Sequence, residues 1–141
     1  MMGSDHVIER LYDAYNRHDA ASAGALYHPE ATHEDIAHGP IKRGSQSIAA
    51  GLQKFFGWFP DAHWDLRARV DGSCGAVAAT YLLTATLQSN MGPIIASGQG
   101  ISLRGVLVLD ISDGLIRRSE DYWDAATFQR QLNQLQREVM I

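Results

Sequence analysis

The chain has 141 residues, a net charge of −4 and no basic run, so nothing in its composition favours nucleic-acid binding. Its 45% hydrophobic and 20% charged residues are ordinary for a soluble globular protein, and the length suits one domain over residues 1–141. No apolar run approaches the roughly 20 residues that a bilayer requires, and the N-terminus lacks the pattern of a signal peptide. The single cysteine, Cys74, excludes an internal disulfide, so we expect a cytoplasmic protein without a membrane partner.

Helical patterns dominate the first part of the chain. Residues 5–17 carry apolar side chains at helical spacing, with Ser4 or Asp5 placed to cap the helix. Asp19 can cap a short second helix, and residues 30–36, EATHEDI, are typical of a short strand before a loop. Residues 45–59 give the clearest helix, whose apolar face carries Ile48, Leu52, Phe55, Phe56 and Phe59 before Pro60 ends it.

The period then changes to two, which predicts strands over residues 63–71, 75–89, 101–111 and 115–123 with tight turns between them. In the first of these strands, alternation places four apolar side chains on one side: Trp64, Leu66, Ala68 and Val70. Asp124 can cap a final helix whose apolar stripe is Phe128, Leu132, Leu135 and Val139. Helices followed by antiparallel strands predict an α+β fold, in which a strongly bent sheet wraps round the long helix as a cone-shaped α+β barrel.

Five segments in this order resemble the SnoaL-like polyketide cyclases, which share the cone fold of nuclear transport factor 2. They are YNRHD, YHPEAT, HGPIKRG, FFGWFPDAHW and DGLIRRSEDYWDAATFQRQL, and they are spread within residues 5–133. The resemblance implies that Asp121 is a general base, because the ring-closing members use an aspartate just before an aromatic residue at that position. It also implies that His33 enters the pocket from the first strand.

The chain departs from the ring-closing members at two positions. Their histidine and glutamine on the penultimate strand match Leu107 and Gly105, whose side chains cannot donate a hydrogen bond. In this respect the chain is more similar to members associated with hydroxylation of anthracycline-type polyketides.

The residues themselves leave other readings open for these groups. Asp121 would share a strand face with Arg117, Ser119 and Trp123, and it could instead pair with an arginine or cap the following helix. Asp124 fits the helix cap better. His33 and His38 are five residues apart and do not fit the helical zinc motif, so we expect no metal.

Further pocket residues follow from the predicted faces. Asp35 shares a strand face with His33, and Arg104 would enter the pocket only if a bulge near Gly100 or Gly105 turned it inward. A flat wall for the substrate would combine Tyr15, Phe55, Trp58, Tyr81, Met91 and Trp123. The same side chains could equally be core residues.

These patterns support three hypotheses. The first is a hydroxylase of aromatic polyketides without a bound cofactor, which uses molecular oxygen while a separate reductase supplies electrons. The second is an aldol cyclase in which another group replaces the missing donor, and the third is a non-catalytic ligand-binding or dimerising module. Self-association as a homo-oligomer is expected from an apolar outer face with Val106, Val108, Ile116 and Tyr122.

Overall fold

The computed structural model describes the backbone of residues 2–140 and the side chains of residues 6–133. In chain order its elements are α1 (Met2–Asn16), α2 (Ala20–Gly24), β1 (Tyr27–Asp35), β2 (Lys42–Arg43), α3 (Ser45–Trp58), β3 (His63–Asp71), β4 (Ala76–Thr86), β5 (Gly100–Ser112), β6 (Leu115–Trp123) and α4 (Ala125–Met140).

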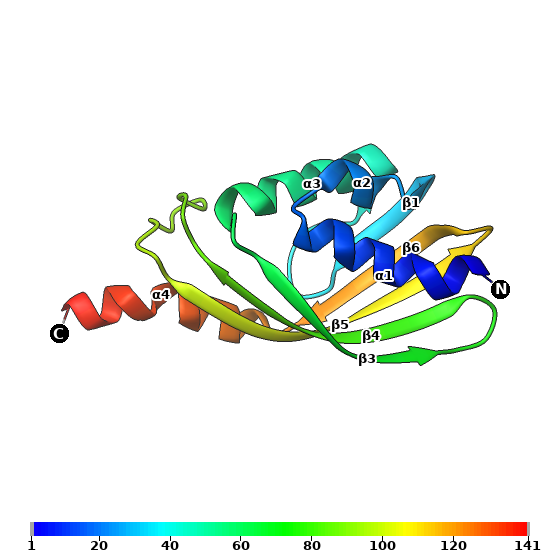
Figure 1. The fold of residues 1–141 in the computed structure, drawn as a ribbon. Coiled ribbons are helices and arrows are strands. Elements are labelled where there is room, and N and C mark those ends of the chain that lie inside the picture. The colour runs from blue at the N-terminus through cyan, green and yellow to red at the C-terminus, as the bar shows by residue number, and fades with distance from the viewer. Residues whose placement is uncertain (1, 141) are drawn as a thin grey trace.

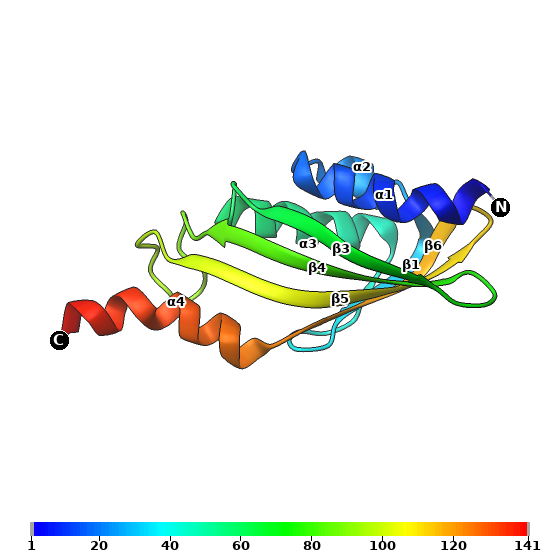
Figure 2. The same ribbon diagram turned by 60° about the horizontal axis from the view of Figure 1, so that its bottom comes forward.

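The strands form one six-stranded sheet in the order β2-β1-β6-β5-β4-β3. Neighbouring strands are antiparallel except β1 and β6, which run parallel. The sheet curls without closing, and α1, α2 and α3 lie on its concave side (Figure 1). Figure 2 shows the same helices above the curled strands and α4 extending from the end of β6. The predicted α+β cone is therefore confirmed.

Local sequence explains where the helices begin and end. Asp19 caps α2, since its Oδ1 accepts a hydrogen bond from the Ser22 amide at 3.0 Å. Asp124 caps α4 as predicted, because it accepts from the Ala126 amide at 3.3 Å and from the Thr127 hydroxyl at 2.6 Å. Helix α1 begins at Met2 rather than at the predicted Ser4 or Asp5. Of the predicted α4 stripe, Leu132 is fully buried, whereas Leu135 and Val139 lie outside the described side chains.

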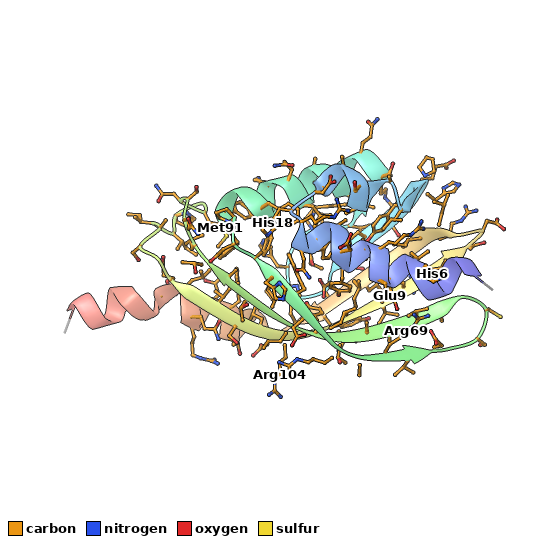
Figure 3. The ribbon with its side chains drawn as sticks, viewed as in Figure 1. His6, Glu9, His18, Arg69, Met91 and Arg104 are labelled. Carbon is orange, nitrogen blue, oxygen red and sulfur yellow. The ribbon has the colours of Figure 1, made fainter. Side chains whose placement is uncertain are left out.

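The prediction of a single apolar face along β3 was wrong in its second half. The register with β4 shifts between Leu66 and Ala68, which is a β-bulge. After the bulge Arg69 lies opposite the buried Ala79, and Val70 turns outward with 64% of its surface exposed. The bulge therefore reverses the expected alternation, and Arg69 turns toward α1 (Figure 3).

A second register shift changes β6. Asp110 lies opposite Arg118 and Ile111 opposite Ile116, so Arg117 is the extra residue of a bulge. Ile116 is consequently fully buried in the core, and Arg117 is exposed instead of sharing the face of Asp121. The apolar outer face predicted for self-association loses Ile116. Self-association through the remaining residues stays a prediction.

Helix α4 covers a strand edge that the sheet leaves free. Residues 100–104 of β5 extend beyond the stretch that pairs with β6. The Gln131 amide accepts from the Ser102 backbone nitrogen at 2.8 Å and donates to the Ser102 carbonyl at 3.0 Å, as a neighbouring strand would. No helix within the described residues is long and apolar enough to cross a membrane.

Candidate functional site

Parallel pairing of β1 with β6 brings the predicted acid–base residues together on the concave face. His33 lies opposite Ser119, and Asp35 lies opposite Asp121. The Ile36 amide donates to the Asp121 carbonyl at 2.9 Å, which fixes this register. His33 and Asp35 from β1 thus belong to one cluster with Asp121, which was predicted from a distant part of the sequence.

Tyr81 on β4 reaches across β5 to Asp121. Its hydroxyl donates to Asp121 Oδ1 at 2.7 Å. Gly105 makes this possible, because it lies opposite Tyr81 in the register and a Cβ there would overlap the tyrosine ring. Gly105, where the chain departs from the family pattern, therefore leaves the space that the Tyr81 phenol occupies.

Burial raises the pKa of Asp121 from 3.8 to about 7. The Tyr81 hydrogen bond opposes this rise, the charge of Asp35 adds to it, and His33 opposes it. Among the described residues, no cation forms a salt bridge with Asp121. The carboxyl can therefore both accept and release a proton near neutral pH. The residue as a whole is half-buried.

His33 is held by a chain of buried hydroxyls. Its Nδ1 lies 2.7 Å from the Ser119 hydroxyl, which lies 2.8 Å from the hydroxyl of Tyr27. Ser119 and Tyr27 are buried, whereas the His33 side chain keeps 12% of its surface exposed. These contacts fix the ring while its other nitrogen faces Asp35 at 3.4 Å.

Asp35 has several polar partners of its own. The Trp123 indole donates to its Oδ1 at 3.3 Å, and Lys42 Nζ lies 4.0 Å from its Oδ2. Burial pushes the pKa of Asp35 upward, but His33, Trp123 and Lys42 outweigh burial and lower it below the ordinary value. The pKa of Asp35 is thus lowered, whereas the pKa of the neighbouring Asp121 is raised.

Tyrosines from α1 complete the wall beside Asp121. The ring of Tyr12 lies 6.2 Å from that of Tyr81 and 5.2 Å from that of Tyr15, which in turn packs at 4.9 Å from Trp64. Burial raises the pKa of Tyr12 and of Tyr15 well above the ordinary value, and the charge of Asp121 raises both further. These phenols stay neutral, so the side of Asp121 that faces α1 is lined by uncharged aromatic rings.

The remaining predicted pocket residues are divided between this cluster and the far end of α3. Leu107 is buried directly opposite Asp121, and Trp123 packs at 5.4 Å on Phe128. Phe55 contacts Phe59 and Trp64, and Trp58 lies under Lys54, so their described contacts are with other aromatic or basic side chains. Met91 comes from the loop between β4 and β5 (Figure 3).

The prediction that a bulge could turn Arg104 into the pocket was wrong. The register between β4 and β5 is continuous from Thr86 to Ala76, so Arg104 pairs with Leu82 on the outer face. Figure 3 shows its side chain pointing away from the sheet on the side opposite α1.

Two open depressions of about 430 and 460 Å³ lie on this outer face, and Arg67, Leu82 and Arg104 line both of them. Asp121, Asp35 and His33 line neither depression. The one carboxylate at their edge is Asp124, which is engaged as the helix cap. The cluster of Asp121, Asp35 and His33 is therefore separate from both depressions.

Three members of the cluster were not predicted as functional: Tyr27, Ser119 and Lys42. Tyr27 and Ser119 could have been found from the sequence by strand alternation. Tyr27 lies an even number of residues from His33, and Ser119 lies an even number from Asp121, so each pair is expected on one strand face. Lys42 lay in a segment that the sequence predicted as a loop. Its place beside Asp35 depends on the pairing of β1 with β2.

Residues 8–119 match the family model of the SnoaL-like domain. The chain belongs to the SnoaL-like family. No curated protein gives a significant sequence match.

Solved structures share the fold over nearly the whole chain. A proposed polyketide cyclase from Xanthomonas campestris is 22% identical with a TM-score of 0.84, covering 92% of this chain and 96% of its own. AclR, a proposed hydroxylase from Streptomyces galilaeus, is 19% identical with a TM-score of 0.81, covering 95% and 98%. A Catenulispora acidiphila protein with a ketosteroid isomerase-like fold is 12% identical with a TM-score of 0.79, covering 90% and 92%.

Proposed function

We propose that this protein is an enzyme of aromatic polyketide biosynthesis that uses Asp121 as a general acid and base. The observation that carries the proposal is the Asp121 carboxyl itself: it lies on the concave face, accepts from Tyr81 and has its pKa raised to about 7. The family and the names of the structural neighbours support the substrate class. A base whose pKa lies near the working pH is the most effective proton acceptor.

The surroundings fit a flat, hydroxylated substrate. Trp123 is half-buried beside the cluster, and Ile36 and Ile41 are exposed large apolar residues in the loop after Asp35. The Ser119 hydroxyl holds the His33 ring in place, and the contact of its Nε2 to Asp35 is long for a hydrogen bond at 3.4 Å. This nitrogen is therefore placed to orient a substrate hydroxyl.

The favoured reaction is hydroxylation of an anthracycline-type ring without a bound cofactor. The hydroquinone form of the substrate supplies two electrons and becomes the quinone, one oxygen atom of O₂ enters a ring C–H bond as C–OH, and the other leaves as water. A separate reductase would produce the hydroquinone. Asp121 removes a phenolic proton from the substrate, and the resulting phenolate makes the ring electron-rich. Asp121 returns the proton when the product forms.

Tyr81 favours a second candidate, an intramolecular aldol cyclisation. In this reaction Asp121 removes a proton from the carbon beside a carbonyl, the new carbon–carbon bond forms, and the accepting carbonyl oxygen takes up a proton. The family's donor at position 107 is replaced by leucine, but the Tyr81 hydroxyl offers a donor beside Asp121.

The test compares Asp121→Asn with Glu120→Gln, which removes an equivalent charge from the outer face of the same strand. We expect Asp121→Asn to lose turnover by at least about 10³-fold, because the base is absent, and Glu120→Gln to stay within about twofold. Folding is checked by circular dichroism. Full activity of Asp121→Asn would refute the proposal.

Oxygen separates the two reactions. Anthracycline aglycones with a quinone reductase should be hydroxylated in air and left unchanged under nitrogen. Ring closure of an anthraquinone ester under nitrogen would favour the cyclase instead. Binding of either compound without turnover would support the ligand-binding module.

A further inference from the structure

The pairing of β1 with β6 makes Asp35 and Asp121 neighbours in the sheet. They are register partners on adjacent parallel strands, and adjacent strands lie about 4.8 Å apart. Both side chains point to the concave face. A charge on one carboxyl therefore acts directly on the other.

The two carboxyls have unequal partners. Asp35 has a lysine, a histidine and an indole N–H within 4.0 Å, and its side chain keeps 27% of its surface exposed. Asp121 has one neutral donor, Tyr81. When two like charges compete for one region, the carboxyl with cationic partners keeps its charge and the other binds the proton.

We propose that Asp35 is a positioning residue that acts through Asp121, because its fixed negative charge makes Asp121 hold its proton more tightly. This inference rests on the proposed function of Asp121 and assigns a separate role to its neighbour. An ordinary aspartate is a weak base near pH 7, and the adjacent charge adds to burial in raising the proton affinity of Asp121.

The other titratable groups around Asp121 do not supply this charge. Tyr12 and Tyr15 from α1, Tyr27 from β1 and Tyr81 from β4 stay neutral, since burial and nearby carboxylate charge raise their pKa values. His33 from β1 and Lys42 from β2 are basic side chains that face Asp35 and supply no negative charge. Asp35 is thus the nearby anion on the elements that pack round Asp121.

The experiment measures the pKa of Asp121 by ¹³C carboxyl NMR in substrate-free protein. In Asp35→Asn we expect this pKa to fall by roughly one unit from about 7, because a like charge is removed. Glu34→Gln is the matched control: it removes one negative charge from the next residue, whose register partner is Glu120 on the outer face, and should shift the value by less than about 0.2 units. Asp35→Glu should restore the wild-type value.

The pH profile of kcat/KM provides the second readout. Its acid limb should move to lower pH in Asp35→Asn by the same amount as the NMR value and stay in place in Glu34→Gln. If Asp35→Asn does not fold, Lys42→Gln perturbs the same pair from the solvent side and should raise the pKa of Asp121.

An Asp121 pKa that moves equally in Asp35→Asn and Glu34→Gln would overturn the inference, as would no rise in Lys42→Gln where that variant is needed. The proposed function fails by a different result, which is full turnover of Asp121→Asn. The NMR shift is measured without turnover, so the two failures are distinguishable.

Discussion

One aspartate lies near the end of strand β6 and another lies just before helix α4, and the two sites shift the carboxyl pKa in opposite directions. Asp121 lies on the concave face, where burial raises its pKa to about 7 with one side-chain donor to oppose the rise. Asp124 lies at the exposed start of α4, where the Thr127 hydroxyl and the backbone amides lower its pKa. Residues of one type, three positions apart, thus become a carboxyl with a raised pKa and a helix cap with a lowered one.

The difference fixes the sign of each residue's effect on stability. Asp121 binds a proton more tightly in the folded chain, so its contribution to stability is complete below its unfolded pKa of about 3.8 and is lost as the pH rises through about 7. Asp124 has a lowered folded pKa, so its contribution is present above the ordinary value and is lost as the pH falls.

Among the variants that leave Asp121 itself in place, Gly105→Ala should give the largest effect on the Asp121 side of this comparison. The new methyl group would overlap the Tyr81 ring and displace its hydroxyl from Asp121, so we expect a loss of turnover of about 10²-fold and destabilisation by about 1–3 kcal/mol. Gly100→Ala on the same strand is the control, since a Cβ there meets no atom within 4 Å. Wild-type turnover in Gly105→Ala would show that the Tyr81 contact is dispensable.

Asp121→Asn should stabilise the folded chain in alkaline solution. The amide removes the cost of a buried carboxylate, so the free energy of unfolding at pH 8 should rise by on the order of 2 kcal/mol, discounted for partial exposure, and change little at pH 4. Urea denaturation at both pH values measures this. A loss of stability at pH 8 would contradict the burial of Asp121.

Tyr81→Phe should change the working pH rather than abolish activity. Its hydrogen bond lowers the pKa of Asp121, so removing it should raise that pKa above about 7 and move the acid limb of kcat/KM to higher pH. We expect turnover at pH 7 to fall by roughly 3–10-fold. Tyr122→Phe removes an outer hydroxyl that contacts Glu120 and should leave the profile in place.

Asp124→Ala should give the smallest effect, confined to stability. Loss of the cap leaves the first amides of α4 without their acceptor, so the melting temperature should fall by roughly 2–4 °C at pH 7 while turnover per folded molecule is kept. The fall should be smaller near pH 3, where the wild-type carboxyl also gains a proton. A loss of turnover comparable with that of Asp121→Asn would remove the division between the two aspartates.

Much of this architecture could be predicted from local patterns. The bounds of β3 and β6, the end of α3 before Pro60, and the caps Asp19 and Asp124 follow from periodicity and turn chemistry. The faces of Ala68, Val70, Arg117 and Ile116 could not be predicted, because each depends on a bulge. A bulge is set by pairing with another strand, and alternation within one strand does not reveal it.

The sequence by itself determined the helices and the longer strands in their order, because helix and strand preferences act over a few neighbouring residues. It missed the two-residue strand β2, and the resemblance singled out Asp121 and His33. Only the tertiary structure decided which residues surround Asp121. The parallel pairing of β1 with β6 joins His33 to a serine 86 positions away, and the gap at Gly105 admits Tyr81. Such contacts depend on how the whole sheet buries its concave face, so proton affinity at Asp121 is a property of the assembled fold.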